Sequence, residues 1–177
     1  PRNYKQTIIY TEYKLKLKIE IRQNAKYDRL RAADNDYPNL RLLLVGKQEL
    51  HGKRLQKWVK DRGIQNVVFT GFVSDTELKW LYEHCKAYIF PSLSEGFGLP
   101  GLEAMTYGAP VISSNATCLP EVYGEAAQYF DPEKTEEIAQ AINKVLKSEK
   151  LRNELVAKGY KQIKKYSWTK MAEQTLS

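Results

Sequence analysis

The sequence predicts an α/β fold, a parallel sheet with helices on both faces. Short apolar runs alternate along the chain with longer amphipathic segments, which indicates repeated strand–helix–strand units. The runs at 41–45 and 87–90 are apolar almost throughout, as expected of parallel strands that are buried on both faces. They end at Gly46 and Pro91, residues that commonly mark the end of a strand.

Two patterns compete at the start of the chain. Ile8, Ile9 and Tyr13 could share one face of a helix, whereas residues 14–21 alternate apolar and charged side chains as a strand does. We expect a helix over residues 3–21, with no strand before it. A turn follows at residues 34–38, where Asp, Asn and Pro gather.

From residue 41 onward, strands and helices alternate regularly. The expected strands are short apolar runs, at residues 41–45, 67–69, 87–90, 110–112 and 127–130. The expected helices are amphipathic or rich in helix formers, at residues 49–62, from Ser74 onward, 100–107, 135–146 and 151–166. Ser74 and Glu77 have the spacing of a capping box. Because ligands bind beyond the carboxyl ends of parallel strands, the loops after these strands should converge on one cleft.

Composition narrows the class of protein. The chain of 177 residues has 42% hydrophobic and 28% charged residues, which is typical of one folded domain. No apolar run is long enough to cross a membrane, and Cys85 and Cys118 give neither a disulfide framework nor zinc-ligand spacing. We therefore expect a cytoplasmic protein.

The net charge of +7 comes from basic residues near the two ends of the chain. Most are expected to be solvated side chains on helix faces. The functional alternative is an anionic partner: a nucleotide diphosphate, or an anionic membrane at which the protein would be peripheral. Without a recognised binding motif, we expect no nucleic-acid partner.

Residues 87–113 combine a strand, a loop, a helix and a second strand. Gly96 and Gly98 allow the backbone to approach a ligand closely, and Pro100 suits a first helical turn. The unpaired amides at the start of such a helix can bind an anion. Glu95, in the loop, can accept hydrogen bonds from the hydroxyl or amide groups of a ligand. This stretch is the strongest candidate for a binding site.

The same stretch resembles the signature of the glycosyl transferases group 1 family, retaining enzymes with the GT-B fold. The family pattern E-G-F-G-L-P-x-L-E is complete at residues 95–103, between FPS at 90–92 and LPEV at 119–122. The resemblance implies that Glu95 is the catalytic-site carboxylate on the donor sugar, with the amides of Gly96 and Phe97. It also implies that the amides of Gly98 and Leu99 face the distal phosphate, and that Glu103 binds the ribose hydroxyls.

Other positions are candidates for the nucleotide. Gly46 and Lys47 follow a strand, where a nucleotide-contacting turn and a plain strand-ending glycine are about equally probable. The resemblance places Val73 beside the base. The family clamps the diphosphate with an Arg and a Lys, and here Arg2 or Lys5 could take that role. No metal or other cofactor is expected.

We interpret residues 1–177 as the C-terminal, Rossmann-like donor domain of a two-domain retaining hexosyltransferase. It would bind a UDP- or GDP-hexose for transfer to a sugar or lipid acceptor. The N-terminal acceptor domain is not in this sequence, so the fragment alone should be inactive. The alternatives are a non-catalytic Rossmann-like nucleotide-binding module and a nucleotide-sugar epimerase or phosphorylase half built on the same fold.

Overall fold

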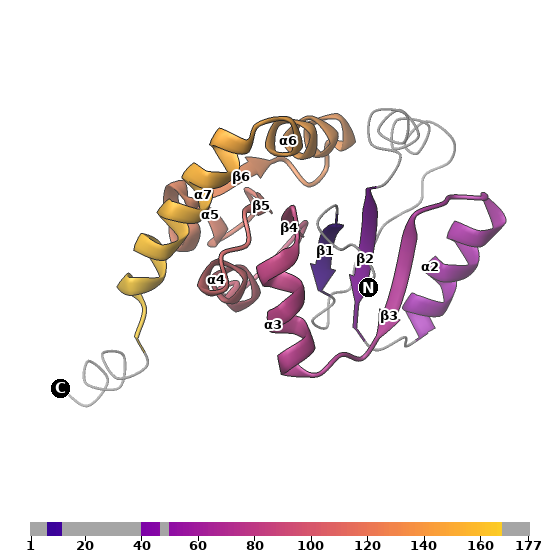
Figure 1. Cartoon of the computed structure of the whole chain (residues 1–177). Helices are drawn as coiled ribbons and strands as arrows, with labels where there is room; N and C mark the ends of the chain where they lie inside the picture. The colour runs from indigo at the N-terminus through magenta and orange to yellow at the C-terminus, as the bar shows by residue number, and fades with distance from the viewer. Residues whose placement is uncertain (1–6, 12–39, 47–49, 168–177) are drawn as a thin grey trace.

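The computed structural model describes residues 7–11, 40–46 and 50–167. Within these residues, six strands form one parallel sheet in the order β3-β2-β1-β4-β5-β6 (Figure 1). The strands are β1 (Thr7–Thr11), β2 (Arg41–Val45), β3 (Val67–Gly71), β4 (Ala87–Phe90), β5 (Val111–Ser114) and β6 (Ala127–Phe130). The predicted parallel α/β fold is therefore confirmed.

β1 corrects the expectation for the start of the chain. We predicted a helix over residues 3–21 and no strand, but Thr7–Thr11 is a strand in the middle of the sheet. It pairs with β2 from Thr7↔Arg41 to Thr11↔Val45, and with β4 on its other side. Pairing on both sides satisfies the backbone groups of this β-branched segment, which a short isolated helix could not match. The rest of residues 3–21, and the turn at 34–38, lie outside the described residues.

The helices follow the predicted order. They are α2 (Leu50–Asp61), α3 (Asp75–His84), α4 (Leu99–Thr106), α5 (Leu119–Tyr123), α6 (Thr135–Lys147) and α7 (Glu149–Gln162), with 3-10 turns at Gly124–Ala126 and Ile163–Lys165. The capping box is confirmed, since Ser74 and Glu77 bond reciprocally at the start of α3. α5 was not expected, and the last helix begins and ends slightly earlier than predicted.

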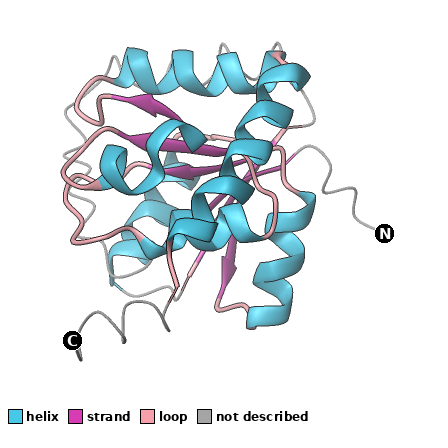
Figure 2. Ribbon diagram, turned by 90° about the vertical axis from the view of Figure 1, so that its left-hand side faces the viewer, coloured by secondary structure: helices cyan, strands magenta, loops and turns pink. Residues whose placement is uncertain are grey.

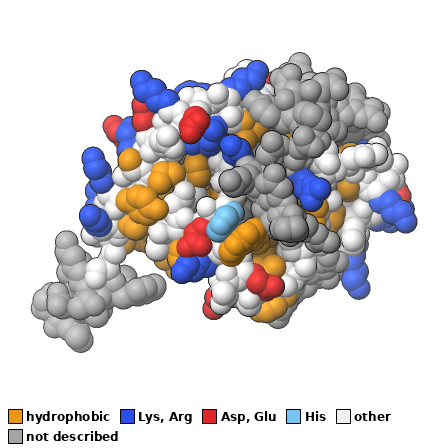
Figure 3. Space-filling view, in the orientation of Figure 1, with side chains coloured by type: hydrophobic (Ala, Val, Ile, Leu, Met, Phe, Trp, Pro, Cys, Tyr) orange, Lys and Arg blue, Asp and Glu red, His pale blue; other side chains and the backbone are white. Residues whose placement is uncertain are grey.

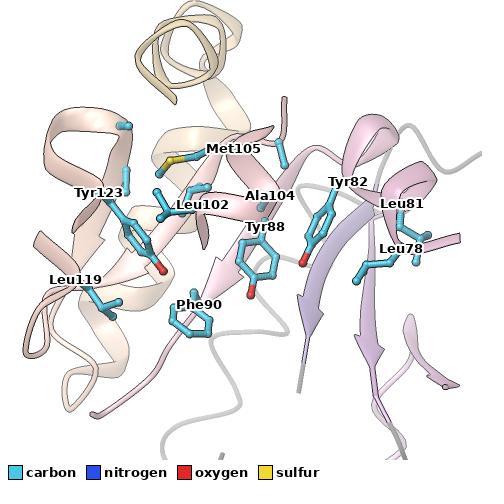
Figure 4. Packing of buried hydrophobic residues seen from close by; sticks show 14 of the residues in the cluster. Leu78, Leu81, Tyr82, Tyr88, Phe90, Leu102, Ala104, Met105, Leu119 and Tyr123 are labelled. Carbon is cyan, nitrogen blue, oxygen red and sulfur yellow. The ribbon is translucent and has the colours of Figure 1, made fainter. Parts of the chain in front are cut away.

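The central strand β4 packs on both faces, as its alternate residues show. Tyr88 and Phe90 join the core under α3, α4 and α5, whereas Ala87 and Ile89 join the core under α6 and α7. Figure 4 shows the first of these cores, and Figure 2 shows helices on both sides of the strands. This double burial explains why the sequence of β4 is apolar throughout.

The strand order places a topological switch point between β1 and β4. The chain builds outward through β2 and β3 on one side of β1, then returns and builds outward through β5 and β6 on the other side of β4. In such sheets the crevice for ligands lies at the carboxyl ends of the two strands that flank the switch point. Residues 91–98, which we call the Glu95 loop, follow the carboxyl end of β4.

Candidate functional site

The Glu95 loop begins with a buried serine that contacts its acidic residue. Ser92 is fully buried, and its Oγ lies 2.9 Å from Glu95 Oε1 and 3.2 Å from the backbone oxygen of Ser94. The hydroxyl can donate to either oxygen. Glu95 itself is half-buried. Because a buried side chain has few rotamers to choose from, Ser92 limits the directions that the Glu95 carboxylate can take.

The segment after β5 braces the Glu95 loop. Ser114 Oγ donates to the backbone oxygen of Ser92 at 2.5 Å. Thr117 Oγ1 lies 3.1 Å from both the amide nitrogen and the carbonyl oxygen of Glu95, so that it accepts from one and donates to the other. Cys118 Sγ donates to the same carbonyl at 3.3 Å. Two loops that are more than 20 residues apart in sequence therefore form one hydrogen-bonded unit.

The start of α4 has the geometry of an anion site. Gly98, the N-cap residue, has a left-handed backbone (φ 89°), and no side-chain cap bond is present there among the described residues. Its carbonyl accepts from the buried Tyr123 hydroxyl at 2.5 Å. A Cβ at Gly98 would lie 2.5 Å from Leu119 Cδ2, so this position requires glycine for space as well as for conformation. The first amides of α4 are thus presented by a rigid backbone turn.

Tyr123 serves this turn as a hydrogen-bond donor. Its ring lies beside Leu102 in the core, close to Leu119 (Figure 4). Burial raises the pKa of its hydroxyl far above the usual range, so the phenol stays protonated at physiological pH.

Glu103 lies on α4 and is half-buried. Burial raises the pKa of its carboxyl group, and the negative charge of Asp75 adds to this shift. Asp75 is the first residue of α3, so the beginnings of α3 and α4 lie near each other at this edge of the sheet. A carboxylate held in a partly desolvated place suggests a role in binding, because it costs stability to keep it charged there.

The carboxyl ends of β2 and β3 also meet here. The Gly46 amide donates to the Gly71 carbonyl at 3.1 Å. Val73, two residues further on, is half-buried and packs against the core under α3 and α4. The predicted positions Gly46 and Val73 therefore lie at the same edge of the sheet as the Glu95 loop.

Three predicted site residues are not placed. Arg2, Lys5 and Lys47 lie outside the described residues, so their assignment to the diphosphate stays a prediction.

Three other residues of the signature, Gly96, Phe97 and Leu99, are exposed at the surface. Gly96 is exposed, and Phe97 and Leu99 are 41% and 52% exposed, which is unusual for large apolar side chains. The Phe97 ring contacts Tyr166 edge to face, with centroids 5.4 Å apart. Exposed apolar side chains next to polar loops are typical of surfaces that a ligand or another domain covers.

Three further features of the described residues were compared with the predictions: the distribution of charged side chains, possible metal ligands and the length of apolar helices. On the face in Figure 3, Lys and Arg side chains of the described residues are scattered among acidic ones and do not form one patch. In the described part of the chain, no group of three or more His, Cys, Asp or Glu side chains could hold a metal ion. None of the described helices is both long and apolar enough to span a bilayer.

Sequence reasoning missed several residues that support the site: Ser92, Asp75, Thr117, Cys118 and Tyr123. Apart from Ser92, which contacts Glu95 three residues away, each acts on an element that is distant in sequence. One signal was present, since Thr117 and Cys118 follow the strand next to β4 and must therefore end at the same edge of the sheet.

The glycine-led helix start and the loop carboxylate at the switch point together define an α/β domain with a candidate anion site at the carboxyl end of β4. Comparison with known proteins identifies its family. The model of the family described as "Glycosyl transferases group 1" matches residues 22–162. The chain belongs to the glycosyl transferases group 1 family.

Curated relatives agree with this family. The chain is 39% identical over 138 residues to the serotype-specific mannosyltransferase WbdA of Escherichia coli, an alignment that covers 77% of this chain and 17% of that protein. The chain spans only 13–29% of the length of the four Escherichia coli mannosyltransferases that it matches.

Solved structures show the same fold. The Anabaena protein Alr3699/HepE in complex with UDP and glucose superposes with a TM-score of 0.77 at 19% identity, over 98% of this chain and 47% of that one. The C-terminal domain of the glycosyl transferase group 1 protein LpcC from Francisella tularensis superposes with a TM-score of 0.67 at 23% identity, over 90% of this chain and 83% of that one.

Proposed function

We propose that this chain is the donor-binding domain of a retaining hexosyltransferase and that it binds a nucleotide-diphosphate sugar. The observation that carries the proposal is the geometry at the switch point. The Glu95 carboxylate and the glycine-led start of α4 lie within one short loop at the carboxyl end of β4. One loop thus offers an acceptor for sugar hydroxyls and donors for a phosphate.

The chemistry of sugar transfer needs these two elements. Breaking the bond between the anomeric carbon and the diphosphate places negative charge on the leaving phosphate. The amides of Gly98 and Leu99 and the dipole of α4 stabilise that charge. Glu95 accepts hydrogen bonds from sugar hydroxyls, each worth about 1.5–3 kcal/mol. Glu103, deeper in α4, binds the ribose.

A mannose donor is the most specific substrate that we propose. Support comes from the names of the relatives, which include mannosyltransferases of the O-antigen chain. Transfer from GDP-mannose or another UDP- or GDP-hexose would require an acceptor site. We propose that this site lies in a separate N-terminal domain, because the chain superposes on most of a structure titled as a C-terminal domain. The isolated chain should then bind the donor without transferring it.

The same proposal covers the location of the protein and whether donor binding requires a metal ion. We propose a cytoplasmic protein that meets an anionic membrane only peripherally, through basic residues near the chain ends. Helix-end amides can supply the charge stabilisation that a metal ion supplies elsewhere, so we propose metal-independent binding.

Isothermal titration calorimetry tests the binding claim. The ligands to titrate are GDP-mannose, UDP-glucose and other UDP- and GDP-hexoses. The chain should bind at least one of these nucleotide sugars more tightly than it binds the matching nucleotide diphosphate. The affinity should be the same with and without EDTA, which removes metal ions. Glu95→Gln should remove most of the advantage of the sugar and leave the nucleotide affinity nearly unchanged. Absence of binding with every UDP and GDP compound would refute the proposal.

The alternatives differ in what they predict. The family match and the relatives' names favour a transferase over an epimerase or phosphorylase. A non-catalytic module would bind nucleotide equally well with and without the sugar, and Glu95→Gln would then have no effect on either affinity.

A further inference from the structure

We propose that Thr117 is a positioning residue for Glu95, and that its hydroxyl group sets the direction of the carboxylate toward the donor sugar. This role rests on the proposed function of Glu95. The observation behind it is the bridge that one hydroxyl makes to both backbone groups of Glu95, accepting from the amide and donating to the carbonyl, each at 3.1 Å.

The bridge fixes the residue from which the carboxylate extends. Glu95 lies in a loop, where neighbouring strands and helices do not supply partners for the backbone. Thr117 supplies both partners, and Cys118 Sγ adds a contact to the same carbonyl at 3.3 Å. Ser92 then contacts the side chain through Oε1. Thr117 therefore holds the backbone of Glu95, and Ser92 holds its carboxylate.

The backbone of Thr117 indicates that the hydroxyl is retained for a reason. Thr117 has φ +49°, in the left-handed region that a β-branched residue rarely adopts. Glycine would fit this conformation without strain but would lack the hydroxyl. Strain of this kind persists where surrounding structure enforces it, and it is concentrated at functional sites.

The bridge also connects the loops that follow β4 and β5. Ser114 Oγ bonds the Ser92 carbonyl at 2.5 Å, and the Thr117 and Cys118 contacts to Glu95 add to this first tie between the two loops. Removing the Thr117 hydroxyl leaves that first tie in place. The expected defect is therefore local to Glu95, with the fold and the start of α4 unchanged.

Three substitutions separate positioning from stability. Thr117→Ser keeps the hydroxyl, Thr117→Val keeps the branched shape without it, and Thr117→Gly removes both hydroxyl and backbone strain. In Thr117→Gly the relief of backbone strain offsets part of the stability that is lost with the hydroxyl, so this variant is the second test if Thr117→Val does not fold. Thr106→Val is the matched control, because it also removes a hydroxyl that donates to a backbone carbonyl, at 2.9 Å within α4.

The main measurement is the ratio of the dissociation constants for GDP and GDP-mannose, or for the UDP pair if that one binds. We expect Thr117→Gly and Thr117→Val to lower this ratio at least about fivefold, the size expected from misplacing one charge-assisted bond. Thr117→Ser and Thr106→Val should keep it within about twofold. The affinity for the nucleotide diphosphate should not change in any variant.

Amide hydrogen exchange provides a readout without ligand. The Glu95 amide should exchange faster in Thr117→Gly and Thr117→Val, and at the wild-type rate in Thr117→Ser and Thr106→Val. An unchanged sugar ratio or an unchanged Glu95 exchange rate in Thr117→Gly would overturn the proposal. If wild type binds no nucleotide compound, the proposed function fails and the role falls with it, whereas binding with an unchanged ratio refutes the role of Thr117 alone.

Discussion

Two segments at the carboxyl edge of the sheet are built differently. The start of α3 is held by its own sequence, because Ser74 and Glu77 bond to each other within four residues. The Glu95 loop and the start of α4 are held by residues 22–25 positions away, namely Thr117, Cys118 and Tyr123. The first segment is a local structure and the second is a tertiary one.

The difference has a functional meaning. A local cap survives changes elsewhere in the protein, which suits a helix that mainly supports the crevice. A loop that takes its shape from a neighbouring loop depends on contacts that its own residues do not supply, such as the bond from Tyr123 to the Gly98 carbonyl. The proposed sugar and phosphate contacts belong to the second kind of segment.

The largest loss of stability should come from adding a side-chain atom at the close contact between α4 and the Tyr123 ring. Gly101→Ala would place a Cβ within 2.8 Å of Tyr123 Cε1 in the core. We expect the free energy of unfolding to fall by about 2 kcal/mol, because overpacking outweighs the gain in helix propensity. Urea denaturation measures the loss.

Gly96→Ala is the matched control for this change. A Cβ at Gly96 would meet no heavy atom within 4 Å. Its free energy of unfolding should stay near that of wild type. An equal loss in both variants would show that the Glu95 loop is sensitive to any added side chain, and that Tyr123 does not shape the start of α4.

A smaller effect is expected at the local cap. Ser74→Ala removes the hydroxyl that accepts from the Glu77 amide, leaves the bond from the backbone amide of residue 74 to the Glu77 carboxylate, and should lower the free energy of unfolding by about 1 kcal/mol. Ser148→Ala, which removes the cap of α7, is the matched control and should cost a similar amount. Thermal unfolding measures both.

The comparison also predicts what Ser74→Ala leaves intact. If α3 only supports the Glu95 loop and the start of α4, the ratio of the dissociation constants for GDP and GDP-mannose should not change. A lowered ratio would contradict the separation between local and tertiary segments.

The smallest effect is a gain in stability at Glu103. Its raised pKa means that the folded protein binds a proton more readily than the unfolded chain, so the charged form destabilises the fold. Glu103→Gln should therefore raise the melting temperature slightly at pH 7. The gain should shrink as the pH falls through the raised pKa of Glu103 and vanish below the unfolded value near 4.5.

The same substitution should weaken nucleotide binding if Glu103 holds the ribose. Glu154→Gln, at an exposed position of α7, is the control and should change neither property. A melting temperature that drops in Glu103→Gln at pH 7 would show that Glu103 contributes to the fold and does not oppose it.

The sequence predicted those features that depend on local pattern. Strands from β2 onward, the capping box and the loop of the signature all follow from residues close to one another. The prediction of a helix at β1 was wrong because Ile8 and Ile9 fit either a helix or a strand. Only the pairing with β2 and β4 decides between the two. The contacts of Thr117 with Glu95 and of Tyr123 with Gly98 could not be predicted for a related reason, because each joins segments that are far apart in sequence.

The roles given to Glu95, Gly96, Phe97, Gly98, Leu99 and Glu103 stay predictions, as do those of Gly46, Lys47, Val73, Arg2 and Lys5. The measurement that tests the central claim most directly is a crystal structure of this chain with GDP-mannose, or with the nucleotide sugar that calorimetry selects. We predict a sugar hydroxyl within hydrogen-bond distance of the Glu95 carboxylate and the distal phosphate at the amides of Gly98 and Leu99. A donor bound away from the carboxyl end of β4, or with its sugar turned away from Glu95, would contradict the account.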